Sequence, residues 1–232
     1  MALTAQSIAE RAAMIIQDMT NVRWPISEIR NWLNDARREL AIVRPDIYST
    51  TNAAYGLKAG AEQDVPTGCL RLLDIPANAG NGPAITPTPR AHLDKQFPQW
   101  TASKYQATVI KHFMLDERDP KKFWVYPPSN GSSSVTVIYQ AAPTDFALDT
   151  GETAIAGNLN EYESIYGGAL VDYIAYRAFS KDSEYAGNAQ RAIAHYQQFQ
   201  NALGQGHKND LTYSPNFANL HGTPSRQLQA GG

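Results

Sequence analysis

The stretch YRAFSKDSEYA, residues 176–186, decides the fold because it joins two predicted helices through a tight turn. Asp182 or Ser183 can accept a backbone N–H that the first turn of the second helix leaves without a partner. Gly204 follows the expected end of that helix, where a left-handed residue usually closes the last turn. Apolar residues of this second helix recur every three or four positions, which predicts one buried face. They are Tyr185, Ala189, Ala192, Tyr196, Phe199 and Leu203.

The helix before this turn carries an aromatic flank of its own. Residues on that flank also recur at helical spacing, and the short connection forces the two helices to pack antiparallel. We therefore predict an αα-hairpin over residues 159–203. Its first helix presents Tyr162, Tyr166, Ala169, Tyr173 and Tyr176 on one side.

Two further helices are predicted at the N-terminus, within residues 1–45. The first spans residues 4–19, and either Thr4 or a capping box of Ser7 and Glu10 begins it. Its apolar residues follow the helical period, so one face packs against neighbouring helices.

The second N-terminal helix lies within RWPISEIRNWLNDARRELAIVRPD, residues 23–46. Ser27 can cap its start, and Pro45 ends it because the residue before a proline avoids the α conformation. The simpler interpretation of its arginine-rich face is a solvated surface, with Asp35 and Glu39 as partial partners. The alternative is a surface that faces another subunit, since arginine suits planar, bidentate contacts. The arginines of this candidate inter-subunit face are Arg30, Arg37, Arg38 and Arg44.

Residues 46–158 differ in composition from the rest of the chain, because most of the chain's 14 prolines lie here. Frequent proline excludes long helices and favours short strands with turns. Three consecutive strands joined by polar turns predict an antiparallel meander. The predicted strands are residues 69–75, 105–114, 123–126 and 135–140, and residues 91–96 form a short helical turn.

The C-terminal segment, residues 204–232, shows neither a helical nor a strand period. Its glycine, asparagine, serine and proline content predicts disorder in an isolated chain. We expect a partner surface to order it. The alternative is a tail that folds back on its own domain. Its candidate anchors are Leu211, Tyr213, Phe217, Leu220 and Arg226.

These segments together predict an α+β fold. An antiparallel helical bundle is built from two N-terminal helices (residues 1–45) and two C-terminal helices (residues 159–203). A small antiparallel β domain (residues 46–158) is inserted between the pairs, and an extended C-terminal arm (residues 204–232) follows.

The composition excludes several classes of protein. The 232 residues are 43% hydrophobic and 18% charged, with a net charge of −2, so no basic excess draws the whole chain to nucleic acid. The single cysteine, Cys69, excludes an internal disulfide and a cysteine-based metal cage within one chain. No apolar run reaches the roughly 20 residues that span a bilayer. Residues 1–15 lack the pattern of a signal peptide, so we expect a protein made in the cytosol without a membrane partner.

A search for catalytic chemistry finds no convincing pattern. The histidines lack zinc-ligand spacing, and no phosphate-binding loop or nucleophile elbow is present. Asp116, Glu117 and Asp119 cluster, but acids before Pro120 are typical of a solvated turn. Cys69 lies among leucines, which indicates a buried, inert thiol. We therefore predict no catalytic residue, no cofactor and no metal. The histidines are His92, His112, His195, His207 and His221.

Several segments, taken in order, resemble tailed-phage adaptor proteins. These are head–tail connector components related to the tail tubular protein A of short-tailed phages. The resemblance covers roughly residues 3–203, and the segment after Leu203 matches less well. The segments that carry it are residues 23–46, GLKAGAEQDVPTGCLRLLDI (56–75), AHLDKQFPQW (91–100), FWVYPP (123–128) and residues 176–186.

The resemblance implies a structural virion protein at the head–tail junction, made in the host cytoplasm. Copies would form a ring beneath the portal, dodecameric in the family, and prolong the DNA channel. The ring would offer a platform for a downstream component such as a nozzle, tail terminator or tube. The helical bundle would build this ring, and DNA would pass without sequence-specific binding.

The resemblance also assigns roles to the C-terminal arm and the lumen. The arm would dock on the portal, with Tyr213, Phe217 and Leu220 between portal subunits and Arg226 in polar contacts. Because lysine and arginine bind phosphate in a salt-dependent manner, a conduit through which DNA slides should be neutral or acidic.

Two alternatives come from other classes of protein. A soluble DNA-binding protein acting in packaging requires a basic stripe, for which the arginine-rich helix is the candidate. A tail-associated hydrolase requires paired carboxylates in a cleft, whereas the one dense acidic cluster lies in a predicted turn.

Overall fold

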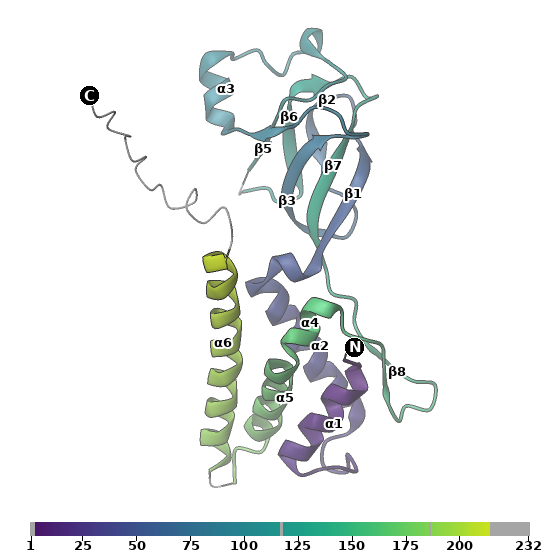
Figure 1. Ribbon diagram of the computed structural model, residues 1–232, viewed down its shortest axis with the longest axis vertical. Helices are drawn as coiled ribbons and strands as arrows, with labels where there is room; N and C mark the ends of the chain where they lie inside the picture. The colour runs from purple at the N-terminus through teal and green to yellow at the C-terminus, as the bar shows by residue number, and fades with distance from the viewer. Residues whose placement is uncertain (1–2, 117, 186, 214–232) are drawn as a thin grey trace, which may run out of the picture. The chain divides into compact units, whose positions relative to one another are not determined.

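The computed structural model describes residues 3–116, 118–185 and 187–213. The chain divides into a helical unit, from the described parts of Met1–Arg44 and Asp145–Gly232, and a β unit, Pro45–Thr144 (Figure 1). The predicted α+β class, with a β insert carried between helices, is confirmed. Residues 145–158, which the sequence analysis assigned to the insert, belong to the helical unit.

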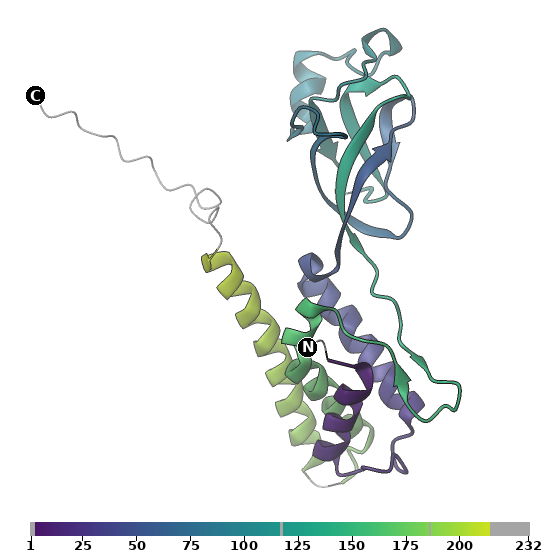
Figure 2. The same ribbon diagram turned by 45° about the vertical axis from the view of Figure 1, so that its right-hand side comes forward.

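Helix α5 lies at the centre of the helical unit and packs against α1, α2 and α6 (Figures 1 and 2). Apolar residues of all four helices meet in its core, among them Ile8, Leu33, Leu170 and Phe199. A short hairpin of β8 and β9 packs on α1 and α2. The elements are α1 (Ala5–Ile16), α2 (Ile26–Val43), β8 (Ala147–Leu148), β9 (Ile155–Ala156), α4 (Glu161–Ile165), α5 (Gly167–Lys181) and α6 (Asn188–Tyr213).

Capping side chains and prolines determine where the N-terminal helices begin and end. Thr4 caps α1 by accepting the backbone N–H of Ser7 at 3.0 Å, so Thr4 is the cap rather than Ser7. The predicted Ser27 cap was wrong, because α2 begins directly after Pro25 and has no side-chain cap. The predicted stop is confirmed, since α2 ends at Val43.

The helix predicted before the 176–186 turn is broken into α4 and α5. Asn160 and Glu163 form a capping box at the start of α4, and Tyr166 separates the two helices. Because α4 lies at the surface, Tyr162 is 65% exposed, and its predicted place in the buried flank was wrong. Tyr166 and Tyr173 are buried as expected.

Helix α6 starts later and runs further than its pattern predicted. It begins at Asn188, whose Nδ2 donates to Asp182 Oδ2 at 2.9 Å, and Tyr185 lies outside it and is exposed. The predicted end at Leu203 was wrong, because the helix continues through Gly204 to Tyr213. Leu211 is therefore helical. The side chains of Leu211 and Tyr213 lie outside the described residues, as do Phe217, Leu220 and Arg226.

A glycine in α6 is required by packing rather than by helix termination. A Cβ at Gly206 would collide with the Tyr166 hydroxyl and approach its ring carbons at 3.1–3.2 Å. Gly206 therefore lets α6 pass close to the junction of α4 and α5. The predicted stop at Gly204 rested on the propensity of glycine to end helices, but α6 continues through that residue.

The β unit contains two main sheets. One has the order β1-β7-β3, with antiparallel pairs, and the other has the order β2-β6-β5-β4. Two short helical turns, η1 (Pro45–Tyr48) and η2 (Ser103–Tyr105), and helix α3 (Arg90–Gln96) complete the unit. The strands are β1 (Ser49–Gly56), β2 (Gly60–Asp64), β3 (Cys69–Asn78), β4 (Thr86–Pro87), β5 (His112–Leu115), β6 (Lys122–Ser129) and β7 (Ser134–Ala141).

The predicted three-stranded meander was wrong. Strands β5 and β6 do pair antiparallel, but β7 leaves them and pairs with β1 and β3 in the other sheet. Most of the strand predicted over residues 105–114 is irregular, and only its end joins β5. The strands predicted over residues 69–75, 123–126 and 135–140 are confirmed as β3, β6 and β7, and the helical turn predicted over residues 91–96 is confirmed as α3.

Asn78 connects these parts of the β unit through its buried side chain. Its Nδ2 donates to the carbonyls of Ile110 (2.8 Å) and Pro83 (2.9 Å), and its Oδ1 accepts from the Ile110 N–H at 2.9 Å. Ile110 itself is fully buried in the core between the sheets. The Asn78 side chain thus pairs with the backbone N–H and carbonyl of Ile110, which have no neighbouring strand to pair with among the described residues.

We expect the substitution Asn78→Ala to destabilise the β unit by about 2–4 kcal/mol, because it leaves buried backbone groups at Ile110 without partners. Hydrogen exchange of the Ile110 amide measures the effect as lost protection. The matched control is Asn130→Ala, which removes an exposed loop asparagine and should change little. Unchanged protection at Ile110 in the Asn78 variant would contradict this assignment.

Candidate assembly surfaces

The arginine-rich face of α2 is partly buried within the helical unit. Arg37 is 6% exposed, and its Nε lies 2.7 Å from Glu163 Oε1. Glu163 is 1% exposed, and its Oε2 accepts from the backbone N–H of Asn160 at 2.9 Å. One carboxylate therefore both caps α4 and neutralises an arginine of α2.

Phe146 is fixed on the same face of α2. Its backbone N–H and carbonyl bind the side-chain amide of Asn34 at 2.9 and 3.1 Å, and its ring lies 4.0 Å from the Arg37 guanidinium. Gly157 has a φ of +118°, and a Cβ there would collide with the Phe146 ring. These contacts explain why the segment after the β unit packs with the helices.

The remaining arginines divide between the interior and the surface. Arg44 is buried and donates to the Tyr166 hydroxyl. Arg38 stays half exposed and pairs with Asp35 at 2.8 Å and with Asp145. Arg30 stays partly exposed beside Asn31.

The interpretation of this face as solvated was therefore wrong at Arg37 and Arg44. Both guanidinium groups point into their own helical unit, so they are not available at a surface that faces another subunit. Glu39, expected as an arginine partner, accepts a hydrogen bond from Tyr173 at 2.9 Å instead. The sequence showed only the positions and spacing of these arginines, whereas their burial depends on partners far along the chain, such as Glu163.

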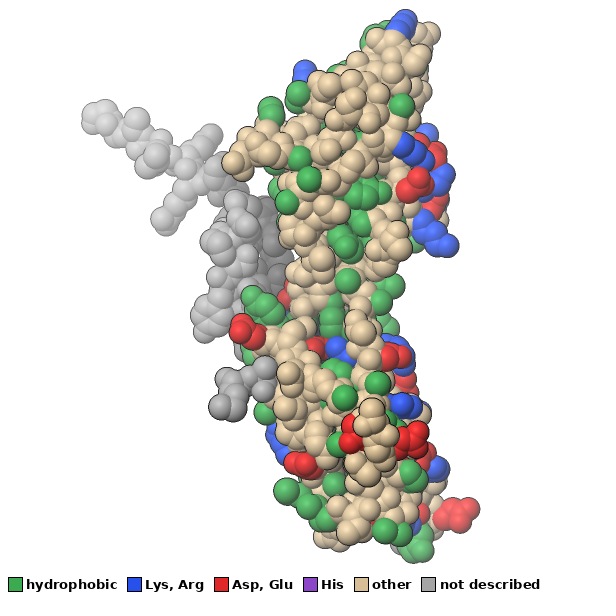
Figure 3. Space-filling view, turned by 90° about the vertical axis from the view of Figure 1, so that its right-hand side faces the viewer, with side chains coloured by type: hydrophobic (Ala, Val, Ile, Leu, Met, Phe, Trp, Pro, Cys, Tyr) green, Lys and Arg blue, Asp and Glu red, His purple; other side chains and the backbone are tan. Residues whose placement is uncertain are grey.

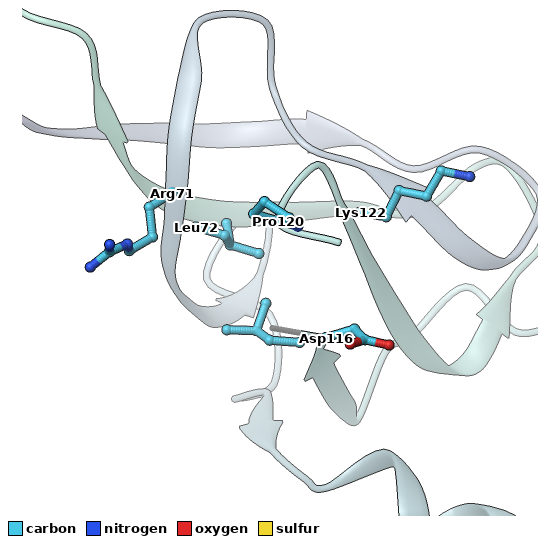
Figure 4. A pocket seen from close by; sticks show the side chains of 6 residues that line it. Arg71, Leu72, Asp116, Pro120 and Lys122 are labelled. Carbon is cyan, nitrogen blue, oxygen red and sulfur yellow. The ribbon is translucent and has the colours of Figure 1, made fainter. Parts of the chain in front are cut away.

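A shallow hollow of about 560 Å³ lies in the β unit (Figure 4). The side chains of Arg71 and Lys122 point away from Asp116, so the charged groups that line the hollow do not converge (Figure 4). Lys122 pairs with Glu62. Among the described residues that line this hollow, Asp116 is the one acid, and a hydrolase needs two. The lining residues are Arg71, Leu72, Leu115, Asp116, Pro120 and Lys122.

Asp116 belongs to a turn network, as its place before Pro120 predicted. Arg118 donates to both carboxylate oxygens at 2.9 Å, and its guanidinium lowers the pKa of Asp116 to about 2. A carboxyl group with so low a pKa stays ionised at neutral pH and cannot serve as a general acid.

A second hollow of about 340 Å³ lies where the end of α1 meets α5 and α6. His195 Nδ1 is 2.8 Å from Asp172 Oδ1, and the His195 ring stacks on Phe179. Histidine and aspartate form two parts of a nucleophile triad, but no serine, threonine or cysteine is among the described lining residues. The lining residues are Ile15, Ile16, Gln17, Phe179, Arg191 and His195.

Other candidates for chemistry are separate from these hollows. His112 Nδ1 contacts Thr86 Oγ1 at 2.7 Å, and burial raises the pKa of the Cys69 thiol. Within residues 3–116, 118–185 and 187–213, no three acidic, histidine or cysteine side chains gather as metal ligands would. None of the described helices is long and apolar enough to cross a membrane.

The surface carries exposed apolar side chains and mixed charge. On the face in Figure 3, acidic and basic side chains lie next to one another in each unit rather than in separate fields. Exposed apolar residues gather at the end of α1 and the following turn, which favours contact with other proteins. They are Met14, Ile15, Met19 and Val22.

The fold consists of a helical unit that carries an inserted β unit. The chain matches the family described as SU10 adaptor protein over residues 3–218, and it therefore belongs to this family of phage adaptors. No curated protein matches the chain. The predicted resemblance is confirmed, and the family name describes a structural rather than a catalytic role.

We expect Arg37→Met to destabilise the helical unit by about 3–5 kcal/mol, because Glu163 then stays buried without this cation. Hydrogen exchange of amides in α2 and α5 reports on this unit alone. The double variant Arg37→Met, Glu163→Gln should recover part of the loss, since no unpaired carboxylate remains. Equal losses in the single and double variants would show that charge pairing is not the cause.

The turn network makes a prediction about pH. The folded pKa of Asp116 lies below its unfolded value, so the ion pair contributes stability above about pH 4 and loses it as the pH falls toward 2. Carboxyl NMR titration should find the pKa of Asp116 at about 2, and in Arg118→Ala it should rise but stay below the ordinary aspartate value, because the backbone N–H of residue 118 still donates to Asp116 Oδ1. The control Lys121→Ala should leave it low. A normal Asp116 pKa in the unmodified protein would contradict the pairing.

Proposed function

We propose that this chain is a head-to-tail connector that forms a homomeric ring beneath the phage portal. The ring prolongs the DNA channel and provides the platform for a downstream tail component. The observation that carries this proposal is the family match, which runs through every described helix and strand of both units. The proposed location is the head–tail junction of the virion.

The division of the chain supports two separate docking functions. The chain leaves the helical unit after Arg44 and re-enters it at Asp145, so the β unit is an insertion that the helices carry. In a connector, one unit can serve the ring and the portal while the other meets the downstream protein. Arg30 and Arg38, which stay partly exposed, are the residues of the candidate inter-subunit face that another copy can reach.

The portal-docking arm is proposed to begin after α6. Leu211 and Tyr213 lie in the last turns of that helix, and Phe217, Leu220 and Arg226 follow it in the sequence. A helix that leads directly into the arm fixes the starting point of the arm on the ring. Tyrosine and arginine, both present among these anchors, are residue types that often supply much of the binding free energy at interfaces.

The two alternative functions gain no support from the geometry. A DNA-binding protein would need an open basic stripe, but the candidate helix buries Arg37 and Arg44 and pairs Arg38 with two acids. A hydrolase would need two carboxylates across a cleft, whereas Asp116 is the one acid among the described residues that line the hollow of the β unit.

Co-sedimentation of the purified chain with the portal ring of its own virus tests the proposal. Full-length protein should bind, and a version ending at Tyr213 should not, although it keeps all of α6. Truncation at Leu203 would be a poor test because it removes the last turns of α6. Failure of the full-length chain to bind would overturn the connector assignment.

Point variants sharpen the test of the arm. Phe217→Ala and Leu220→Ala should each weaken portal binding about tenfold, the effect of losing one apolar anchor of about 1.4 kcal/mol. Asn219→Ala, at a neighbouring polar position, is the matched control and should bind normally. Normal binding by both anchor variants would move the interface from the arm to the helices.

A further inference from the structure

The outward face of α6 has an unusual composition. Its inward residues Ala192, Phe199 and Leu203 are buried against α5, and in both ribbon views α6 lies at the edge of the helical unit (Figures 1 and 2). The opposite face repeats every three or four residues and is exposed, with one exposed apolar side chain, Ile193 (59% exposed), among its amides. Its residues are Gln190, Ala194, Gln197, Asn201 and Gln205, with Gln198 and Gln200 beside them.

This face carries no formal charge along several turns. From Ala192 to Gly206 the sequence contains no aspartate, glutamate, lysine or arginine, although Arg191 precedes the stretch and Lys208 follows it. Exposed helix faces of globular proteins are normally rich in charged side chains. The stretch from Gln190 to Gln205 is about 22 Å long at 1.5 Å per residue.

The amides of this face have no hydrogen-bond partner among the described residues. Each glutamine or asparagine side chain offers two donor hydrogens and an acceptor oxygen. Burying them against another protein without matching partners would cost about 1–3 kcal/mol for each group left unpaired. A surface that stays in contact with water avoids this cost. The face therefore suits an environment that is solvated and yet requires the absence of charge.

A conduit for DNA is such an environment. Lysine or arginine along its wall would bind phosphates and release counterions, which holds DNA in a salt-dependent manner. Aspartate or glutamate would repel the same phosphates. Amides exchange hydrogen bonds readily with water and phosphate and add no net charge.

We propose that the amide face of α6 lines the channel of the ring and contacts passing double-stranded DNA. This inference rests on the proposed connector function and adds the element that faces the lumen. The remaining exposed surfaces of the helical unit, including the apolar end of α1, are then left for protein contacts.

Photo-crosslinking in assembled particles tests which molecule lies against this face. Cys69 is the only cysteine, so a Cys69→Ser background accepts a single benzophenone-labelled cysteine at a chosen site. Asn201→Cys and Gln197→Cys place the label on the amide face. Gln96→Cys, an exposed glutamine at the end of α3, is the matched control. Particles are illuminated while filled with DNA and again after ejection.

Crosslinks from positions 197 and 201 to DNA, lost after ejection and absent at position 96, would support the proposal. Crosslinks only to a second copy of the chain, to another virion protein, or to nothing would overturn it while leaving the connector function intact. Gln205→Cys provides a further site if either variant fails to enter particles. Absence of even the unmodified chain from particles would instead overturn the connector function itself.

Discussion

The helical unit depends on the buried pair of Arg37 and Glu163. Two charges taken out of water stabilise each other, since removal of either leaves the charge of the other uncompensated in the interior. Glu163 also caps α4, so the same carboxylate sets where the returning chain re-enters the helices. The β unit lies between these two residues in the sequence. The pair therefore joins α2, which precedes the insertion, to α4, which follows it.

The position of α6 depends on residues close to this pair, at the junction of α4 and α5. Tyr166, at the break between α4 and α5, binds Arg44 and lies against Gly206, so a side chain at that position would push α6 away. Helix α6 continues past this contact to Tyr213. The long helix gives the molecule a straight, amide-covered face and a fixed starting point for the proposed arm. The contacts of Tyr166 with Arg44 and Gly206 thus position α6, the helix to which we assign function.

The sequence predicted what depends on local periodicity and missed what depends on distant partners. Apolar spacing identified the four long helices and strands β3, β6 and β7, because side-chain direction repeats along a single element. Pairing of β7 with β1 and β3 was missed, since adjacent strands were assumed to be neighbours. Burial of Asn34 and Arg37 was also missed, because their partners Phe146 and Glu163 lie far along the chain. Gly204 suggested a helix end, although α6 continues through it, and the contact of Gly206 with Tyr166 is invisible in the sequence.

The central claim is that this family member serves as a connector whose helical unit surrounds the DNA path. A localised reconstruction of the head–tail junction in purified particles tests it most directly. The account predicts a ring of this chain coaxial with the portal, with α6 facing the DNA and the residues after Tyr213 reaching toward the portal. Density for this chain elsewhere in the virion, or a ring whose channel is lined by the β unit, would contradict it.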